Sequence, residues 1–250
     1  MKTQKLLTYL RKCIQEYDLI QGNDRIAVGV SGGKDSLVLL YGLHALQKFY
    51  PVPYELCAVT VDTGFHMDYT KVQAFCEALN IPYHIEHTQI AEIIFDARKE
   101  ENPCSLCANM RRGALTNAAE TLKCTKLALG HHKDDYLTTL LLSLLYEGRF
   151  YTFAPKTEYE DRKISIIRPM LYVPEAAVQN FAEEQHFPVI KNLCPEDHLT
   201  KRAEMADLIQ TLQKKYPDIK EKLLHAVVTS DIPDWVQLTG GNNDGGTELS

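Results

Sequence analysis

Residues 26–40 read Ile-Ala-Val-Gly-Val-Ser-Gly-Gly-Lys-Asp-Ser-Leu-Val-Leu-Leu, and this stretch decides the fold class. Its first five residues are mostly apolar and β-branched, which predicts a short buried strand over 26–30. After the two glycines, apolar side chains recur at helical spacing at Leu37, Leu40 and Leu43, which predicts a helix. A strand that passes through a glycine turn into a helix is typical of an α/β domain with a parallel sheet.

The turn itself, Ser31-Gly-Gly-Lys-Asp-Ser36, has the composition of a phosphate-binding loop. Glycines let the backbone bring its amide groups close to phosphate oxygens, and the following helix N-terminus adds partial positive charge. Ser31 and Ser36 add hydroxyl donors, and Lys34 adds a cation. The pattern is neither the Walker loop nor GxGxxG. The alternative interpretation is a glycine turn with a Ser/Asp helix cap and no ligand.

The hexapeptide SGGKDS resembles the signature of the PP-loop ATP-pyrophosphatases. In that class, ATP is cleaved between its α and β phosphates, an adenylated intermediate forms, and pyrophosphate leaves. The resemblance implies that residues 31–36 bind ATP, with Gly32 and Gly33 supplying backbone contacts. It also implies that Lys34 and Asp35 take part in catalysis.

The rest of the chain alternates strands and helices as far as about residue 172. Further strands are predicted over 56–61, 83–87, 126–129 and 164–167, and further helices over 68–79, 90–100, 103–123 and 134–146. From Pro174 onward the pattern is helical, over 174–186, about 197–215 and 218–229. We therefore expect an α/β fold with a doubly wound, mostly parallel sheet and a helical C-terminal appendage.

This pattern divides the chain into four segments. Residues 1–24 form an N-terminal amphipathic helix, and residues 25–172 form the ATP-binding domain, which carries a CxxC motif. Residues 173–232 form a helical C-terminal region with a further cysteine in a polar setting. Residues 233–250, rich in glycine, asparagine and aspartate, have the composition of a disordered tail.

Two more loops follow predicted strands and should meet the phosphate loop at one edge of the sheet. One carries Asp62, and the other is Gly130-His-His-Lys-Asp-Asp135. We expect Asp62, Gly130 and His131 to contact ATP, and Asp35 and Asp135 to hold Mg²⁺ and act in catalysis, because hard cations prefer carboxylate and phosphate oxygens. The alternative for Asp134-Asp135 is a helix N-terminal pair without a ligand.

Composition bounds the function classes. No apolar run approaches the roughly 20 residues that span a bilayer, and the N-terminus lacks the features of a signal peptide, so we expect a cytoplasmic protein. The net charge of −6 gives no general support for nucleic-acid binding. The charge is uneven, however, because residues 104–168 hold 10 Lys/Arg and 7 Asp/Glu. A locally basic face on an acidic protein can still bind a polyanion.

Seven cysteines, an odd number, argue against a disulfide framework. Cys104-Ser-Leu-Cys107 is compatible with redox, zinc or cluster chemistry, or with two unligated thiols. Cys194 is a third cysteine in a polar, loop-like setting, and three thiolates without a fourth partner suit a [4Fe–4S] cluster with one open iron. The other four lie in helix or strand patterns and are expected to be small buried hydrophobes; they are Cys13, Cys57, Cys76 and Cys124.

Five motifs arrive in a fixed order: SGGKDS, PCSLC followed by Arg111-Arg112-Gly113, GHHKDD, Ile-Arg168-Pro, and Asn-Leu-Cys194. Together they resemble the tRNA 2-thiocytidine synthetase (TtcA) family from about residue 25 to residue 228. This resemblance implies an adenine-nucleotide α-hydrolase fold, ATP with Mg²⁺, and a [4Fe–4S] cluster on the three cysteines named above. It also implies thiolation of C2 of a cytidine in the tRNA anticodon loop.

The sequence departs from that family at three places. Lys191 stands where a second cysteine is common, the loop after the second strand reads VDTGFH, and Pro195-Glu-Asp follows the last motif. These departures concern the substrate more than the cofactors.

The leading hypothesis is an ATP-dependent tRNA sulfurtransferase that adenylates a base and replaces its oxygen with sulfur. The sulfur comes from a cysteine desulfurase or from sulfide, carried on the open iron or as a cysteine persulfide. Candidate phosphate contacts for tRNA are Arg111, Arg112, Lys133 and Arg168, with Arg149, Lys201 and Arg202. A homodimer is left open. The rivals are a lysidine synthetase-like ligase, a 2-thiouridine synthetase, and a nucleotide-binding sensor that is not an enzyme.

Overall fold

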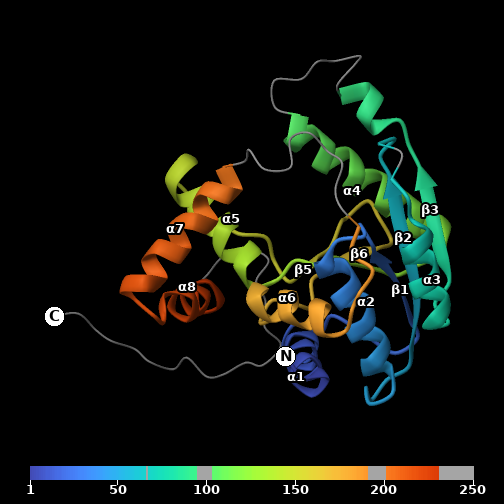
Figure 1. The fold of residues 1–250 in the computed structure, drawn as a ribbon, viewed down its shortest axis with the longest axis horizontal. Coiled ribbons are helices and arrows are strands. Elements are labelled where there is room, and N and C mark those ends of the chain that lie inside the picture. Colours follow the sequence, from blue (N-terminus) through green and yellow to red (C-terminus); the bar gives the residue numbers. More distant parts are fainter. Residues whose placement is uncertain (66, 95–102, 191–200, 231–250) are drawn as a thin grey trace.

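The computed structural model describes residues 1–65, 67–94, 103–190 and 201–230, and a six-stranded sheet forms the centre of the α/β part (Figure 1). The strands lie in the order β3-β2-β1-β4-β6-β5. Their bounds are β1 (Asp24–Gly29), β2 (Tyr54–Asp62), β3 (Tyr83–His87), β4 (Lys126–Ala128), β5 (Lys156–Thr157) and β6 (Ser165–Ile167). All neighbours are parallel except β5, which runs antiparallel to β6. The doubly wound α/β sheet is confirmed.

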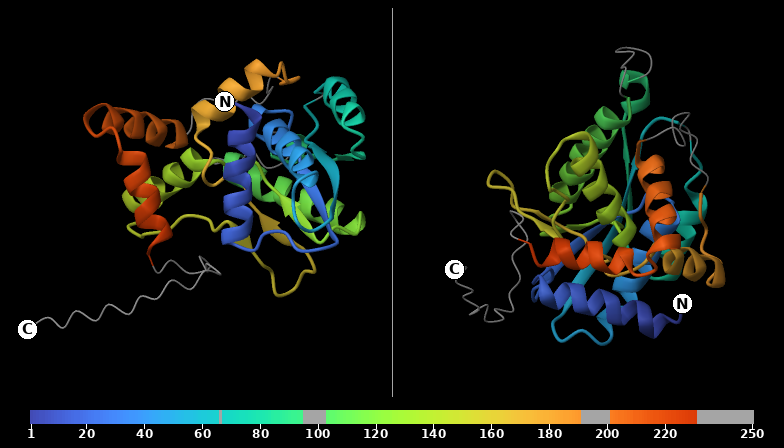
Figure 2. Two further views of the ribbon diagram at one scale, coloured as in Figure 1. Left: turned by 90° about the horizontal axis from the view of Figure 1, so that it is seen from below. Right: turned by 90° about the vertical axis from the view of Figure 1, so that its left-hand side faces the viewer.

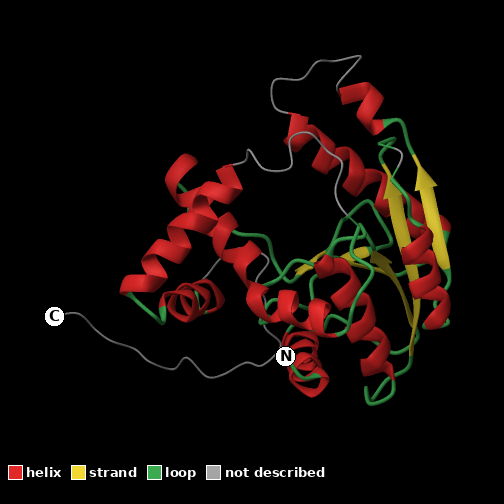
Figure 3. Cartoon of the chain, in the orientation of Figure 1, coloured by secondary structure: helices red, strands yellow, loops and turns green. Residues whose placement is uncertain are grey.

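Helices lie on both sides of the strands (Figure 3). Their bounds are α1 (Thr3–Glu16), α2 (Lys34–Gln47), α3 (Thr70–Ala78), α4 (Pro103–Thr121), α5 (Lys133–Tyr146), α6 (Glu175–Glu184), α7 (Lys201–Lys215) and α8 (Ile219–Val228). Successive side chains of β1 enter two different cores, since Ile26 and Val28 pack with α1, α2 and α6, whereas Ala27 packs with α4. This two-sided burial explains why residues 26–28 of the strand are all apolar.

The N-terminal helix α1 is part of the main core. Leu6, Leu10 and Ile14 are fully buried and belong to the same cluster as the apolar side chains of α2. A Cβ atom added at Gly42 of α2 would lie only 2.5 Å from Leu10 Cδ1. The missing side chain at position 42 therefore lets the two helices approach closely.

The helical C-terminal region packs in two places. Helix α6 lies against α2, whereas α7 and α8 lie against α5, to one side of the sheet (Figures 1 and 2). Met205 and Ile209 of α7 and Val227 of α8 are buried in the main core. The C-terminal helices are thus joined to the α/β part by apolar contacts; the division of the chain into four segments stays a prediction.

The predicted elements agree closely with the structure, with one omission. The antiparallel strand β5 was not expected, because its two residues are too few for a periodic signal. Of the helix predicted over 90–100, residues 90–94 are helical and 95–100 lie outside the described residues, as do 191–200 and 231–250. Within the described ranges, no helix has the length and apolar character that a bilayer crossing requires.

Leu10→Ala tests whether α1 stabilises the whole domain. Removing this fully buried side chain should lower the free energy of unfolding by about 2–5 kcal/mol, since it leaves a cavity between α1 and α2. Urea denaturation measures the loss. Thr8→Ala on the exposed face of the same helix should stay within about 0.5 kcal/mol of the parent protein. Equal, small effects in both variants would mean that α1 does not support the core.

Candidate functional site

The order in which the chain adds strands to the sheet reverses between β1 and β4. From β1 the chain adds β2 and β3 on one side, whereas β4 and β6 lie on the other. The carboxyl ends of two such strands border a crevice in which open α/β sheets bind ligands. The loops that leave β1 and β4 are the SGGKDS and GHHKDD loops, so the topology brings the two motifs together.

These two loops touch through a glycine. A Cβ atom added to Gly130 would lie 3.0 Å from the carbonyl carbon of Asp35 and 3.1 Å from the amide nitrogen of Ser36. Both are backbone atoms in the first turn of α2, so they cannot move aside as the end of a flexible side chain could. Glycine at position 130 therefore fits this close approach, and any side chain would crowd the backbone of α2.

The phosphate loop is shaped by its own serines. The Ser36 hydroxyl donates to the Gly33 carbonyl (2.9 Å) and accepts from the Ser31 amide (3.2 Å), while the Gly33 amide donates to Ser31 Oγ (3.3 Å). Gly32 has a φ of +83°, in the region that favours glycine. In this structure the serine hydroxyls hold the turn, and their contact with phosphate stays a prediction.

His132 lies close to acidic side chains of both loops. Its Nε2 lies 3.6 Å from Asp35 Oδ1, and its Nδ1 lies 3.4 Å from Asp135 Oδ2. The same Asp135 oxygen accepts the His132 amide at 2.9 Å and so caps the start of α5. Burial raises the pKa of Asp135 above its ordinary value, although His132 partly offsets this.

Asp35 and Asp135 are suited to a cation that also has phosphate ligands. Asp35 Oδ1 is buried and receives no hydrogen bond with good geometry from the described residues, although Lys34 Nζ is 3.1 Å away. Within the described residues, no group of three or more acidic, histidine or cysteine side chains is arranged to hold a metal. Two carboxylates suffice for Mg²⁺ when substrate phosphates and water complete its shell.

His131 and His132 point in different directions, as expected of neighbours at a strand end. The His131 ring packs on Phe153 with 4.7 Å between ring centroids. Burial, with a further contribution from Arg168 and Arg202, lowers the pKa of His131 to about 3, so the imidazole is neutral at physiological pH. Its buried Nδ1 has no hydrogen-bond partner among the described residues. Contact of His131 with ATP stays a prediction.

Asp62 ends β2 at the same edge of the sheet. Its carboxylate accepts the Gly64 amide at 3.1 Å and lies 3.1 Å from His87 Nδ1. These contacts shape the turn after the strand, and its contact with ATP stays a prediction.

The two cysteines of the CxxC stand one helical turn apart at the start of α4. Cys104 is exposed and Cys107 is partly exposed, and Arg111 and Arg112 are exposed further along the helix. Cys194 lies outside the described residues. The four remaining cysteines are buried, as expected; they are Cys13, Cys57, Cys76 and Cys124.

Arg168 does not project toward solvent. It is only 6% exposed, and its guanidinium donates to the Ala154 carbonyl (2.7 Å) and to Thr157 Oγ1 (2.9 Å) while lying over the Phe153 ring. The expectation that it contacts tRNA therefore fits this structure poorly. The sequence could not show that Arg168 is buried. The residues around an arginine at the end of a strand look the same whether its side chain faces water or a backbone carbonyl.

Comparison with known proteins identifies the family. The PP-loop domain family matches residues 2–207. The chain is 38% identical over 220 residues to the tRNA-cytidine(32) 2-sulfurtransferase of Citrifermentans bemidjiense, with 86% of each covered, and 38% identical over 231 residues to that of Geobacter sulfurreducens, with 91% of this chain and 90% of the relative covered. The chain belongs to the PP-loop family of tRNA-cytidine(32) 2-sulfurtransferases.

A solved structure supports the same assignment. The U34-tRNA thiolase NcsA from Methanococcus maripaludis, solved with its [4Fe-4S] cluster, superposes with a TM-score of 0.74 at 30% sequence identity and covers 89% of this chain and 77% of that one. The resemblance carried by the five sequence motifs is thereby confirmed.

In this PP-loop sulfurtransferase family member, the middle of the GHHKDD motif anchors the C-terminal helices. Lys133 is 6% exposed, and its Nζ lies 2.6 Å from Glu221 Oε1 on α8. Asp134 pairs with Lys220 of α8 and accepts the Glu175 amide at the start of α6 (2.7 Å). Lys133 therefore acts in helix docking in this structure, and its contact with tRNA stays a prediction.

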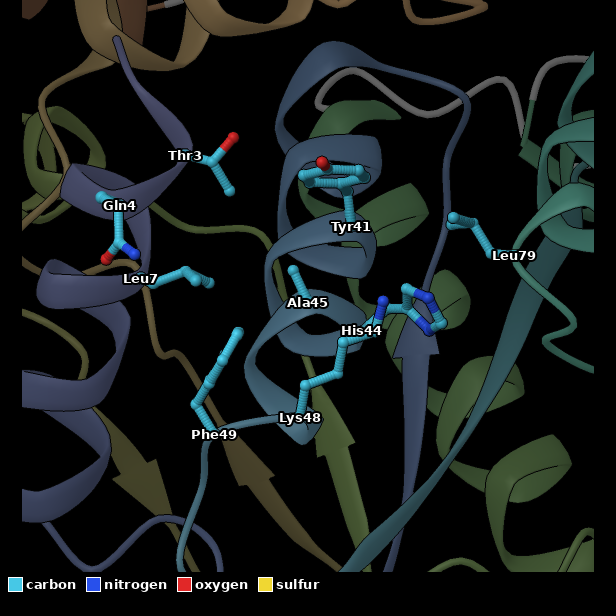
Figure 4. A pocket seen from close by; sticks show the side chains of 9 residues that line it. All are labelled: Thr3, Gln4, Leu7, Tyr41, His44, Ala45, Lys48, Phe49 and Leu79. Carbon is cyan, nitrogen blue, oxygen red and sulfur yellow. The ribbon is translucent and has the colours of Figure 1, made fainter.

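A polar cavity of about 270 Å³ lies between the two loops and the C-terminal helices. Its charged lining residues are Lys34, Asp35, His132, Asp134, Asp135, Glu175, Arg202 and Lys220. A larger hollow of about 400 Å³ lies between α1 and α2, where Leu7 and Phe49 approach it (Figure 4). That hollow is mainly apolar and contains no residue of either loop, so the smaller cavity is the candidate functional site.

Sequence reasoning missed several members of this cavity. His132 lies in the recognised motif, but the choice between two adjacent histidines depends on which one faces α2. Glu175 and Lys220 come from helices far along the chain, and nothing in a single sequence shows that they return to the first loop.

Lys220→Met tests the anchoring of α8. Burial raises the pKa of Asp134, but hydrogen bonds from Lys220 and the Glu175 amide outweigh it and hold that pKa below its ordinary value. The resulting stability is present above a pH of about 4 and is lost as the pH falls through the folded-state pKa. Lys220→Met should therefore lower the free energy of unfolding by about 1–3 kcal/mol at pH 7 and flatten its dependence on acid pH.

Lys222→Met is the matched control. Its side chain is 73% exposed and lies 4.0 Å from Asp218, so its loss should change stability by less than about 0.5 kcal/mol. Urea denaturation from pH 7 down to pH 3 compares the two variants. The same acid profile in the Lys220 variant as in the parent protein would contradict the role of the Asp134–Lys220 pair.

Proposed function

We propose that this chain is an ATP-dependent tRNA sulfurtransferase that replaces the oxygen at C2 of a cytidine in the anticodon loop with sulfur, forming AMP and pyrophosphate. The observation that carries the proposal is the contact of Gly130 with the first turn of α2, because it sets His132 and Asp135 beside the phosphate loop. Family membership supports it independently, since the relatives are tRNA-cytidine(32) 2-sulfurtransferases.

In the first step, the base oxygen attacks the α-phosphate of ATP, the bond from that phosphorus to the bridging oxygen breaks, and pyrophosphate leaves. The amides of Gly32 and Gly33 and the N-terminus of α2 would bind the phosphates. Burial lowers the pKa of Lys34, but the carboxylates of Asp35 and Glu175 outweigh it, so the ammonium stays charged.

Asp35 and Asp135 are the residues that would hold Mg²⁺. The buried Asp35 oxygen without a hydrogen bond and the nearby Asp135 carboxylate fit a cation shared with phosphate oxygens. When bound, the ion neutralises the charge that develops on the pyrophosphate.

In the second step, sulfide displaces AMP from the adenylated base. A carbon–sulfur bond forms at C2, and the carbon–oxygen bond breaks with AMP as the leaving group. Free sulfide can serve directly as the donor. A cysteine desulfurase would instead pass its sulfur on as a cysteine persulfide, whose outer sulfur attacks C2; a second thiol must then reduce the S–S bond to release the thiolated base.

The cysteines fit a cluster site. Cys104 and Cys107 share one turn of α4, where the helix N-terminus favours thiolates. The Ile190 amide donates to the Gly32 carbonyl at 2.9 Å, so residue 190, four positions before Cys194 in the sequence, lies beside the phosphate loop. When bound, a [4Fe–4S] cluster on these three cysteines supplies an iron without a protein ligand, at which sulfide can be held.

The tRNA contacts proposed for this face are Arg111 and Arg112, which are exposed on α4 beyond Cys107. Because the chain as a whole is acidic, with a net charge of −6, binding depends on such local cations and should weaken with salt. A cytoplasmic location and assembly as a homodimer belong to the same proposal.

The cluster is tested by iron content after anaerobic purification. Wild-type protein should carry about four irons per chain and the visible absorption of a thiolate-bound cluster. Cys104→Ala, Cys107→Ala and Cys194→Ala should each lose both, because each removes one of three ligands. Cys76→Ala, a buried cysteine on α3, should keep them. Stoichiometric zinc without iron in the wild type would contradict the cluster.

The ATP step is tested by Asp35→Asn. With tRNA present, formation of AMP and pyrophosphate should fall at least about a hundredfold, because a preorganised charge at the phosphates is lost. Iron content should not change, and 2-thiocytidine should be absent from tRNA nucleosides analysed by mass spectrometry. Glu77→Gln, on the exposed face of α3, is the control. ADP and phosphate as products would show that a different bond is cleaved.

A further inference from the structure

The cavity between the two loops and the C-terminal helices contains charges of both signs, and most of them are paired. Lys220 Nζ lies 2.5 Å from Asp134 Oδ1, and Lys34 Nζ lies 3.1 Å from Asp35 Oδ1. Arg202, from the first turn of α7, also lines the cavity. Within residues 1–65, 67–94, 103–190 and 201–230, its guanidinium makes no ion pair or hydrogen bond.

Arg202 lies within electrostatic range of the loop after β4. Burial has the largest effect on both groups: it raises the pKa of Asp135 and lowers that of His131. The positive charge of Arg202 lowers the pKa of both. The cavity therefore presents the Asp35 and Asp135 carboxylates together with a guanidinium that has no partner among the described residues.

This combination suits a metal-bound pyrophosphate group. Two carboxylates can hold Mg²⁺, which leaves phosphate oxygens turned toward the remaining walls of the cavity. A guanidinium forms two parallel hydrogen bonds with a phosphate, which a carboxylate wall cannot do. The volume of about 270 Å³ is below the roughly 300–1,000 Å³ of pockets for drug-sized ligands, so it suits part of a nucleotide.

We propose that Arg202 binds the phosphate groups of ATP that leave as pyrophosphate, so that α7 completes the phosphate site from the C-terminal region. The inference rests on the proposed ATP-dependent function and adds a residue to it. The position of Arg202 depends on the docking of α7 against α5 and on the anchoring of α8 at Lys133 and Asp134. A phosphate of the tRNA backbone has the same chemistry, and the experiment separates the two sources.

The probe is inorganic pyrophosphate with Mg²⁺, titrated by calorimetry into anaerobically purified, cluster-containing protein without tRNA. Arg202→Gln should weaken pyrophosphate binding by roughly tenfold to a hundredfold, the loss expected for a charge-assisted hydrogen bond. The pyrophosphate affinity of Arg202→Lys should lie between those of the wild type and Arg202→Gln, because lysine keeps the charge and lacks the planar guanidinium. Lys214→Gln removes the same charge from the exposed last turn of α7 and should bind like the wild type.

A melting temperature equal to that of the wild type shows that each variant is folded, which we expect because Arg202 is exposed. Unchanged pyrophosphate affinity in Arg202→Gln would overturn the proposal. If Arg202→Gln binds tRNA more weakly in the absence of ATP but keeps its pyrophosphate affinity, the proposal is overturned, and Arg202 contacts an RNA phosphate instead. If wild-type protein forms no AMP and pyrophosphate with tRNA, the proposed function fails; if it forms both and Arg202→Gln binds pyrophosphate normally, only the role of Arg202 fails.

Discussion

The close approach of two backbone segments, Gly130 and the first turn of α2, is the constraint on which the site depends. It follows from the pairing of β1 with β4, and the lack of a side chain at position 130 leaves room for it. The same approach brings His132 between Asp35 and Asp135. Two motifs separated by almost a hundred residues of sequence therefore act as one charged site.

The start of α5 has two roles, one carried by residues 132 and 135 and the other by residues 133 and 134. His132 and Asp135 contact each other, and His132 also approaches Asp35 of the phosphate loop, whereas Lys133 and Asp134 pair with α8 and Asp134 also accepts the amide at the start of α6. Neighbouring residues at a helix start point about 100° apart, so four consecutive polar residues can serve both sides. This arrangement links the position of the C-terminal helices to the geometry of the site, because both depend on the same backbone.

The sequence predicts the parts of the fold that local patterns encode. Strand β1, the glycine loop and α2 follow from residues 26–40. The predicted strand over 83–87 has the same bounds as β3. Both succeed because apolar periodicity and glycine turns are local signals. The interior positions of Lys133 and Arg168 are not local. Each depends on a partner distant in sequence, Glu221 for the lysine and the Ala154 carbonyl for the arginine. Without knowledge of these partners, a basic residue in a motif is predicted to contact phosphate, as Lys133 and Arg168 are here.

The pairing of Lys34 explains how an acidic cavity can accept an anion. Lys34 Nζ lies 3.3 Å from Glu175 Oε1, and the Glu175 side chain is 50% exposed. An exposed pair of this kind contributes only about 0–1 kcal/mol, because water screens it and two long side chains must be ordered. In the proposed reaction, a phosphate group with several negative oxygens would replace Glu175 at little cost, and Glu175 would pair with the lysine again when pyrophosphate leaves. Burial lowers the pKa of Lys34, but Asp35 and, to a smaller extent, Glu175 outweigh it. The exposed Glu175 thus helps to position Lys34 without binding it tightly, which a fully buried partner could not do.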